Sequence, residues 1–423
     1  MDPQNPDDSL EQRVVASIEE KMRLRQLTVT SDVGTHTICP FPDFLVGIDD
    51  GIRTPQLASF GPIHYREDNR FEDHKVDLLN KFLSRTQYLQ RDLPYYVNKL
   101  KDLKDEIKSR YSPKIVLPPD DKLLNMMLYD GSFMVELFRM YDEGTDFMMP
   151  SRWQIPTLIS DLLKLENQLP FCVLKKLFEE SNVGQHKSIR TLPDLAWRFL
   201  SQTFCRSRSS EMVYIHVQEP KHLLDLFRRS LLPATNFDAQ RSKRYGLTPI
   251  QSVKYLRSVG ITVRQKTAKS LLEIDFRKFQ IPPLALKIPP LAINDFTNAV
   301  LANCVALELC FPDQSKHFTT YVCFMSCLVK QPEDVGYLRS ADIIEGNAED
   351  ETSFMNMLNS TGRNVRFTLR ECYLWKQFRE IHSYYNSYWA SIRRNLLQYN
   401  HFMLYFTLLQ VLVGILSWLL PGK

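Results

Sequence analysis

The sequence lacks the short motifs that mark the common enzyme classes. Only 14 of its 423 residues are glycine, and none belongs to the glycine-rich loop of nucleotide triphosphatases or to the dinucleotide fingerprint. No serine stands in a nucleophile elbow, and no histidine begins the paired-histidine motif of zinc metalloproteases. We therefore expect a protein that is not an enzyme and that has no cofactor.

Cysteine and an excess charge of one sign are also scarce. The chain has 53 basic and 49 acidic residues, whereas nucleic-acid-binding proteins usually concentrate basic residues on one face, so we expect no nucleic-acid partner. The eight cysteines lack paired spacing. This indicates that most are reduced, buried thiols and that the body of the protein faces the cytosol. Cys304, Cys310, Cys323 and Cys327 could be counted as a zinc set, but they lie on apolar helical stripes, which favours buried thiols over a metal site.

The chain divides by composition into three parts. Residues 1–35 predict a leading helix and a polar linker, without a signal-peptide pattern. Residues 36–400 predict one body, since 44% hydrophobic and 11% aromatic residues are enough for a sizeable core. Within this body, residues 205–249 are rich in arginine, serine and lysine and predict a variable basic loop region.

Apolar residues recur at helical spacing along most of the body, so the expected fold class is mainly α. Leu158, Leu162, Leu165 and Leu169 form one apolar stripe, which Pro170 must end because it lacks an amide donor and clashes with the preceding turn. We expect two helices that meet near Leu169.

Three short segments instead alternate with a period of two, which is typical of strands. They are residues 260–264, 272–276 and 284–288. We expect them to form a small β-sheet beside the helices.

No charged side chain occurs between Phe402 and Leu420. As a helix with ~1.5 Å per residue this stretch would span about 28 Å, close to the hydrocarbon thickness of a bilayer. The pattern predicts a transmembrane helix at 401–420, a short tail at 421–423, and a cytosolic body on an unspecified membrane. A helix buried in the body is the alternative, and self-association through the span is a further possibility.

The chain resembles a plant family catalogued as domain of unknown function 247, also called UPF0481. The resemblance rests on Phe60–Tyr65, Met126–Phe138, Asp161–Leu174, His222–Arg228 and Tyr255–Arg264. Their order and spacing match over residues 36–420.

The resemblance implies a plant-specific, largely helical protein that ends in one membrane span and has no established activity or cofactor. Some grass members are linked to self-incompatibility. Ser132 stands where the family usually has cysteine, and Tyr65 where it usually has a second histidine. These differences argue against catalytic or metal roles at the two positions.

The family motifs contain the candidate site residues, each with two interpretations. Glu166 could be a general base, but with Asn167 and Gln168 it is better placed to satisfy free backbone groups around Pro170. Asp130 and Gly131 could place a carboxylate at a turn, or could cap and join two helices.

His64 could act with a nearby acid, or could bond to the backbone of its own turn. We expect a membrane-anchored recognition or scaffold protein that binds the lipid bilayer and an unknown protein, in signalling or self-recognition. The alternative is a membrane-surface hydrolase or transferase that uses Glu166, Asp130 or His64.

Overall fold

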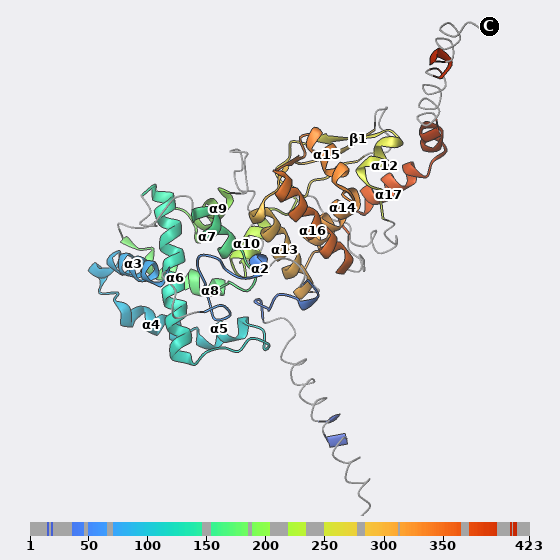
Figure 1. Ribbon diagram of the computed structural model, residues 1–423. Coiled ribbons are helices and arrows are strands. Elements are labelled where there is room, and N and C mark those ends of the chain that lie inside the picture. The colour runs from blue at the N-terminus through green and yellow to red at the C-terminus, as the bar shows by residue number, and fades with distance from the viewer. Residues whose placement is uncertain are drawn as a thin grey trace, which may run out of the picture.

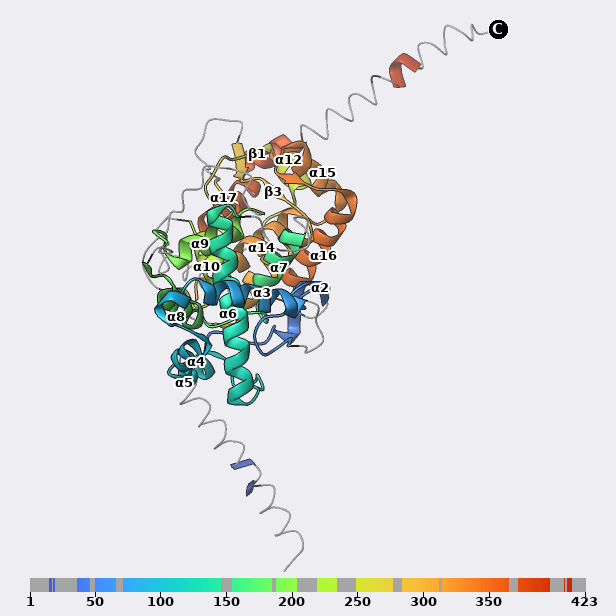
Figure 2. The same ribbon diagram turned by 90° about the vertical axis from the view of Figure 1, so that its left-hand side faces the viewer.

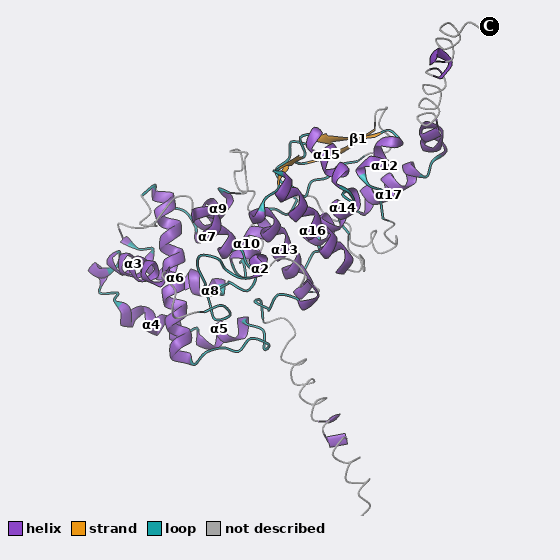
Figure 3. Cartoon of the chain, in the orientation of Figure 1, coloured by secondary structure: helices purple, strands orange, loops and turns teal. Residues whose placement is uncertain are grey.

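Helices make up most of the structure, a computed structural model in which the strands among the described residues lie near one end (Figure 1, Figure 3). It describes residues 15–16, 18–19, 36–45, 50–65, 71–145, 154–184, 188–203, 219–233, 249–276, 284–311, 314–364, 372–395, 407 and 409–412. The α-helices are α2 (Asp50–Arg53), α3 (Phe71–Ser84), α4 (Leu93–Lys101), α5 (Lys104–Arg110), α6 (Asp120–Glu143), α7 (Ile155–Leu162), α8 (Phe171–Ser181), α9 (Leu192–Ser201), α10 (Leu223–Ser230), α12 (Val253–Ser258), α13 (Asp295–Cys310), α14 (His317–Leu328), α15 (Pro332–Ser340), α16 (Ala348–Asn364) and α17 (Trp375–Tyr385). Short 3-10 turns lie at η1 (Asp43–Leu45) and η2 (Gln87–Leu89).

Helix α6 organises the first half of the chain. It begins directly after Pro119, and Asp120 and Asp121 in its first turn interact favourably with the helix dipole. It ends at Gly144, whose φ of 65° is the left-handed conformation that glycine adopts without strain. Helices α3, α4, α8 and α9 pack around it (Figure 2), in keeping with the expected mainly α fold.

Helices α13 and α14 form the centre of the second half. Every residue from Thr297 to Glu308 and from His317 to Leu328 is buried, as expected for helices with protein on all sides. Helix α13 contacts α2, α7 and α10 as well as α14 and α16, so it joins the two halves. The main hydrophobic core is continuous from Ile38 to Ala390.

The predicted sheet is present but smaller than expected. Strands β1 (Ile261–Gln265) and β2 (Leu284–Ile288) pair in parallel, and a separate pair joins β3 (Leu291–Ala292) to β4 (Ile344–Glu345). The third predicted strand, 272–276, contributes only an antiparallel bridge between Asp275 and Lys287.

The break at Pro170 is confirmed, but the first helix ends earlier than predicted. Helix α7 stops at Leu162 and α8 begins at Phe171. The residues between them form turns that place Glu166, Asn167 and Gln168 inside the protein, all at most 2% exposed. Leu165 and Leu169 are buried from these turns and not from a helical stripe.

The predicted transmembrane helix is not supported, and this part of the fold prediction is wrong. Within Phe402–Leu420 the structure describes only residues 407 and 409–412, which are helical and exposed. No helix among the described residues is both long and apolar enough to cross a membrane, because a span needs about 20 consecutive apolar residues. The other residues of this stretch lie outside the described residues.

Two further predictions fall mostly outside the described part of the chain. Of residues 1–35 only 15–16 and 18–19 are described, and they are helical and exposed. Most of the predicted basic loop region, 205–249, also lies outside; its described middle contains α10.

Glycine at position 131 allows α8 to pack closely on α6. A Cβ at Gly131 would lie 2.6 Å from Cδ1 of Leu177 and 3.3 Å from Cγ1 of Val173, whereas a Cβ at Gly336 in α15 would meet nothing within 4 Å. Both substitutions to alanine gain helix propensity, but only Gly131→Ala crowds a helix interface. We expect Gly131→Ala to have an unfolding free energy about 1–3 kcal/mol below that of Gly336→Ala in urea denaturation. Equal stabilities would contradict close packing at this interface.

Candidate functional site

The candidate residues make many of their contacts with residues 50–65, which are called the surface segment below. After the single turn of α2 the segment has no regular secondary structure. Its main chain is therefore not paired within a helix or sheet, and buried polar groups need other partners. Those partners are side chains of α6, α7 and the α7–α8 turns.

Asp161 satisfies three consecutive amides of the surface segment. Its carboxylate accepts hydrogen bonds from the N–H groups of Gln56 (2.9 Å), Leu57 (2.7 Å) and Ala58 (2.9 Å). Lys164 Nζ lies 2.9 Å from the same carboxylate and compensates its charge. Both side chains are at most 1% exposed.

Asn167 and Gln168 continue these contacts. Asn167 accepts from the Phe60 N–H at 2.6 Å and donates to the Ala58 carbonyl at 3.0 Å. Gln168 donates to the Leu162 carbonyl at the end of α7 and to the Lys164 carbonyl, which also accepts from the Asn167 N–H. Its oxygen accepts from the Leu224 N–H at the start of α10. The prediction that these two residues satisfy backbone groups near Pro170 is thus confirmed, with additional partners far away in sequence.

Glu166 lies where three distant groups meet. One oxygen accepts from the Phe41 N–H at 2.7 Å, and the other lies 2.7 Å from Arg53 Nε and 3.0 Å from His64 Nε2. Burial alone would raise the pKa of this carboxyl group, but the hydrogen bonds from His64, Arg53 and Phe41 outweigh it and lower the pKa to about 2.

Asp130 fixes the sharp turn of the surface segment at Gly61. It accepts from the Gly61 N–H at 2.8 Å and lies 2.6 Å from Lys75 Nζ. Burial raises the pKa of Asp130, against the opposing effect of Lys75. Gly61 has φ of 69°, and a Cβ there would lie 2.8 Å from the Gln168 carbonyl oxygen, so the turn requires glycine.

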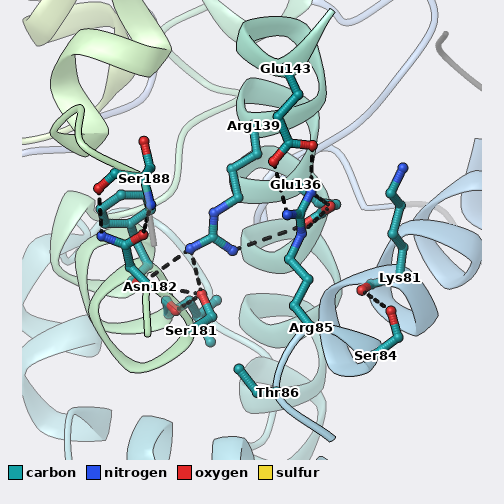
Figure 4. Close-up of polar contacts among 12 residues, drawn as sticks. Lys81, Ser84, Arg85, Thr86, Glu136, Arg139, Glu143, Ser181, Asn182 and Ser188 are labelled. Carbon is teal, nitrogen blue, oxygen red and sulfur yellow. Dashed lines mark hydrogen bonds and ion pairs between the residues drawn. The ribbon is translucent and has the colours of Figure 1, made fainter. Parts of the chain in front are cut away.

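A second charge cluster, buried except for Glu143, lies farther along α6 (Figure 4). Arg85 Nε donates to both oxygens of Glu136, while its two terminal nitrogens reach Glu143 at 2.9 and 3.0 Å. Arg139 donates to the Ser181 hydroxyl at 2.9 Å. Burial lowers the pKa of Arg139 to about 10, so it keeps its charge at neutral pH. These contacts join α3, α6 and α8 at one level of the bundle.

The structure thus brings His64 and Glu166 into contact and places Asp130 behind Gly61, three residues before His64. Gly131 lies against α8 and does not form a turn between helices, which corrects that prediction: α6 continues through it. Ser132 is buried and donates to the Tyr129 carbonyl. Among the described residues no group of three or more histidine, cysteine or acidic side chains is arranged to hold a metal ion.

Sequence reasoning missed Asp161, Lys75 and Arg53. Asp161 and Lys164 lie three residues apart within the apolar leucine stripe. This pair could have indicated buried charges with partners, because such charges are rarely buried without them. Nothing in the local sequence indicates that their partners lie 103–110 residues earlier.

Residues 38–420 match the model of the family described as a plant protein of unknown function, domain of unknown function 247. The chain belongs to this plant family. The matched region includes all the site residues described above, so the cluster lies within the family's common region.

Two curated relatives from Arabidopsis thaliana belong to the UPF0481 proteins. One is 30% identical over 92% of this chain and 89% of its own length. The other is 20% identical over 88% and 84%, respectively. No solved structure matches the chain.

Removing one acceptor from Asp161 is expected to loosen the surface segment. In Asp161→Asn an NH2 group replaces one oxygen and faces N–H donors that then have no acceptor. We expect the unfolding free energy to fall by about 3 kcal/mol. We also expect hydrogen exchange of the amides of Gln56–Ala58 to become faster. Asp142→Asn is the matched control, because Asp142 pairs with Arg190 and Arg198 nearer the surface and should cost under about 1 kcal/mol. Unchanged exchange in Asp161→Asn would contradict this role.

The free energy of unfolding should begin to fall on acidification at a higher pH than that at which the carboxylates become protonated. His222 is completely buried at the start of α10, where Nδ1 accepts from the Asp225 N–H, and burial lowers its pKa from 6.5 to about 4. The unfolded chain therefore binds the proton more tightly, so this contribution is complete above pH 6.5 and is lost as pH falls toward 4. The loss should approach about 3 kcal/mol.

His222→Asn keeps a side-chain acceptor at the same helix start but does not titrate. We expect its unfolding free energy to depend less steeply on pH between 6.5 and 4 than that of the wild type, measured by urea denaturation. Glu166, with a pKa near 2, loses its contribution only below about pH 4.5, and this loss is common to both proteins. Identical slopes for the two proteins would exclude His222 as the cause.

Proposed function

We propose that the protein acts by binding a protein partner, and that the surface segment 50–65 forms part of the binding surface. The observation that carries this proposal is that the segment is irregular yet held in one shape by buried side chains. Asp130, Asp161 and Asn167 bind its main chain. This leaves Gln56 and Tyr65 exposed and Arg53 partly exposed, while Ile52, Ala58 and Phe60 pack into the core.

The outward side chains are of the types that contribute most to protein interfaces. Tyr65 is 44% exposed, the Arg53 side chain is 39% exposed, and Gln56 is exposed. Arginine and tyrosine are enriched among residues that dominate binding energy. A segment that is already ordered loses little conformational entropy on binding, which favours affinity.

The contacts of Glu166 support binding over catalysis. Both of its oxygens accept hydrogen bonds, and a carboxylate with a pKa of about 2 is a weak general base near neutral pH. Asp130 is likewise held between Lys75 and Gly61. Signalling or self-recognition, which the family resemblance implies for some grass members, is the setting in which we propose that this binding occurs.

Affinity capture with the full chain tests the proposal. Wild type, Tyr65→Ser and the matched control Tyr255→Ser, whose ring is 54% exposed on α12, would be compared against plant extract by quantitative mass spectrometry. The enriched partner would then be purified and titrated. We expect Tyr65→Ser to weaken binding about tenfold or more, with Tyr255→Ser unchanged.

Two results would contradict the proposal. One is equal affinity of Tyr65→Ser and the control for every captured partner. The other is a catalytic turnover that is lost in His64→Asn and retained in Tyr65→Ser, which would favour the enzymatic alternative based on His64 and Glu166.

A further inference from the structure

Two cysteines, Cys39 and Cys310, differ from the other described cysteines in their surroundings. Cys304, Cys323 and Cys372 are buried, and burial raises the pKa of each. The side chains of Cys39 and Cys310, by contrast, are hydrogen-bonded to each other although 271 residues separate them. Both are free thiols.

The main chain on both sides of Cys39 is held in place. The Ile38 N–H donates to the Arg110 carbonyl at 2.9 Å, and the Ser112 N–H donates to the Ile38 carbonyl at 2.8 Å. On the other side, the Phe41 N–H binds Glu166. Cys310 is the last residue of α13, and its thiol donates to the Pro40 carbonyl oxygen at 3.7 Å. The two thiols therefore meet between two fixed segments.

The environments of the two sulfurs differ in a way that assigns their roles. The hydrogen bond from Cys39, followed by the charges of Lys114 and Lys316, lowers the pKa of Cys310 against the effect of burial. The same hydrogen bond, together with burial, raises the pKa of Cys39. Cys39 is 6% exposed, whereas Cys310 is partly exposed. Cys310 is thus the more accessible of the two thiols and the one that loses its proton more readily, and Cys39 is its protonated neighbour.

We propose that Cys39 and Cys310 form a reversible dithiol–disulfide pair that is oxidised by hydrogen peroxide. The Cys310 thiolate attacks one peroxide oxygen, so that an S–O bond forms, the O–O bond breaks, and hydroxide leaves and takes up a proton as water. The sulfur of Cys39 then attacks the Cys310 sulfenic acid. The S–S bond forms, the S–O bond breaks, and the second hydroxide leaves with the Cys39 proton as water.

The overall reaction converts two thiols and one hydrogen peroxide into one disulfide and two waters. The two sulfurs lose two electrons, and the peroxide gains them. The product bond would join the segment that begins the body to the end of its central helix, α13. This site is independent of the binding surface proposed above, and its test does not require a partner.

The test uses the reduced full-length protein and graded hydrogen peroxide. After acid quenching and alkylation, peptide mass spectrometry reports the state of each cysteine. Cys172 is the internal reference, because it is also partly exposed but burial raises its pKa to about 12. We expect a Cys39–Cys310 cross-linked peptide to form at least about tenfold faster than Cys172 is oxidised, and dithiothreitol to reverse it.

Variants separate the two steps. In Cys39→Ser, Cys310 should accumulate as a sulfenic acid that dimedone traps. In Cys310→Ser, Cys39 should stay reduced. Cys172→Ser should form the Cys39–Cys310 disulfide at the wild-type rate. Circular dichroism checks that each variant is folded, and the wild-type experiment stands without them. Oxidation of Cys310 no faster than Cys172, or oxidation without the Cys39 cross-link, would overturn the proposal.

Discussion

The structure depends on satisfying main-chain groups that lie outside its helices and strands. The N–H groups of Phe41, residues 56–58, Phe60 and Gly61 lie against the helical body, where buried N–H groups without partners would each cost free energy. The required acceptors are supplied by Asp130, Asp161, Glu166 and Asn167. The helices around them are therefore arranged so that a few polar side chains face inward.

Burying acceptors of this kind introduces charge, and the structure compensates it in the same way at several places. Asp161 lies beside Lys164 and Asp130 beside Lys75. In the second half, Glu308 accepts from the Phe318 and Thr319 N–H groups at the start of α14 and pairs with Arg228. Each carboxylate thus binds backbone amides on one side and a cation on the other. Such a site is stable only when both partners are present, because removing one leaves an uncompensated buried charge.

Local patterns in the sequence predicted the helices well and the site only in part. The break at Pro170 is decided by neighbours within one helical turn and was confirmed, whereas the turn expected at Asp130 and Gly131 is absent because α6 continues through both residues. The end of α7 at Leu162 was not predicted, because the Gln168 side chain takes up the carbonyls that a longer helix would have used. A periodicity of leucines cannot show that competition.

The roles of the polar residues were harder to predict, because their partners are distant. Glu166 was recognised as a backbone partner, but its contacts to Phe41 and Arg53 cross 125 and 113 residues. The charge-free C-terminal stretch gave a wrong prediction for a different reason: apolar composition alone is compatible with a membrane span, whereas the described helices contain none.

Buried ionic contacts usually add less stability than apolar packing of the same volume would, so their presence calls for another reason. Here the reason is geometry: hydrogen bonds have direction, and those from Asp161 and Asn167 define where each amide of residues 56–60 lies. The Phe41 N–H connects Glu166 to the chain two residues after Cys39. A bond between Cys39 and Cys310 would therefore hold one end of the same arrangement whose other end presents Arg53 and Tyr65. The proposed disulfide would thus lie next to the segment that Glu166 holds, although neither proposal depends on the other.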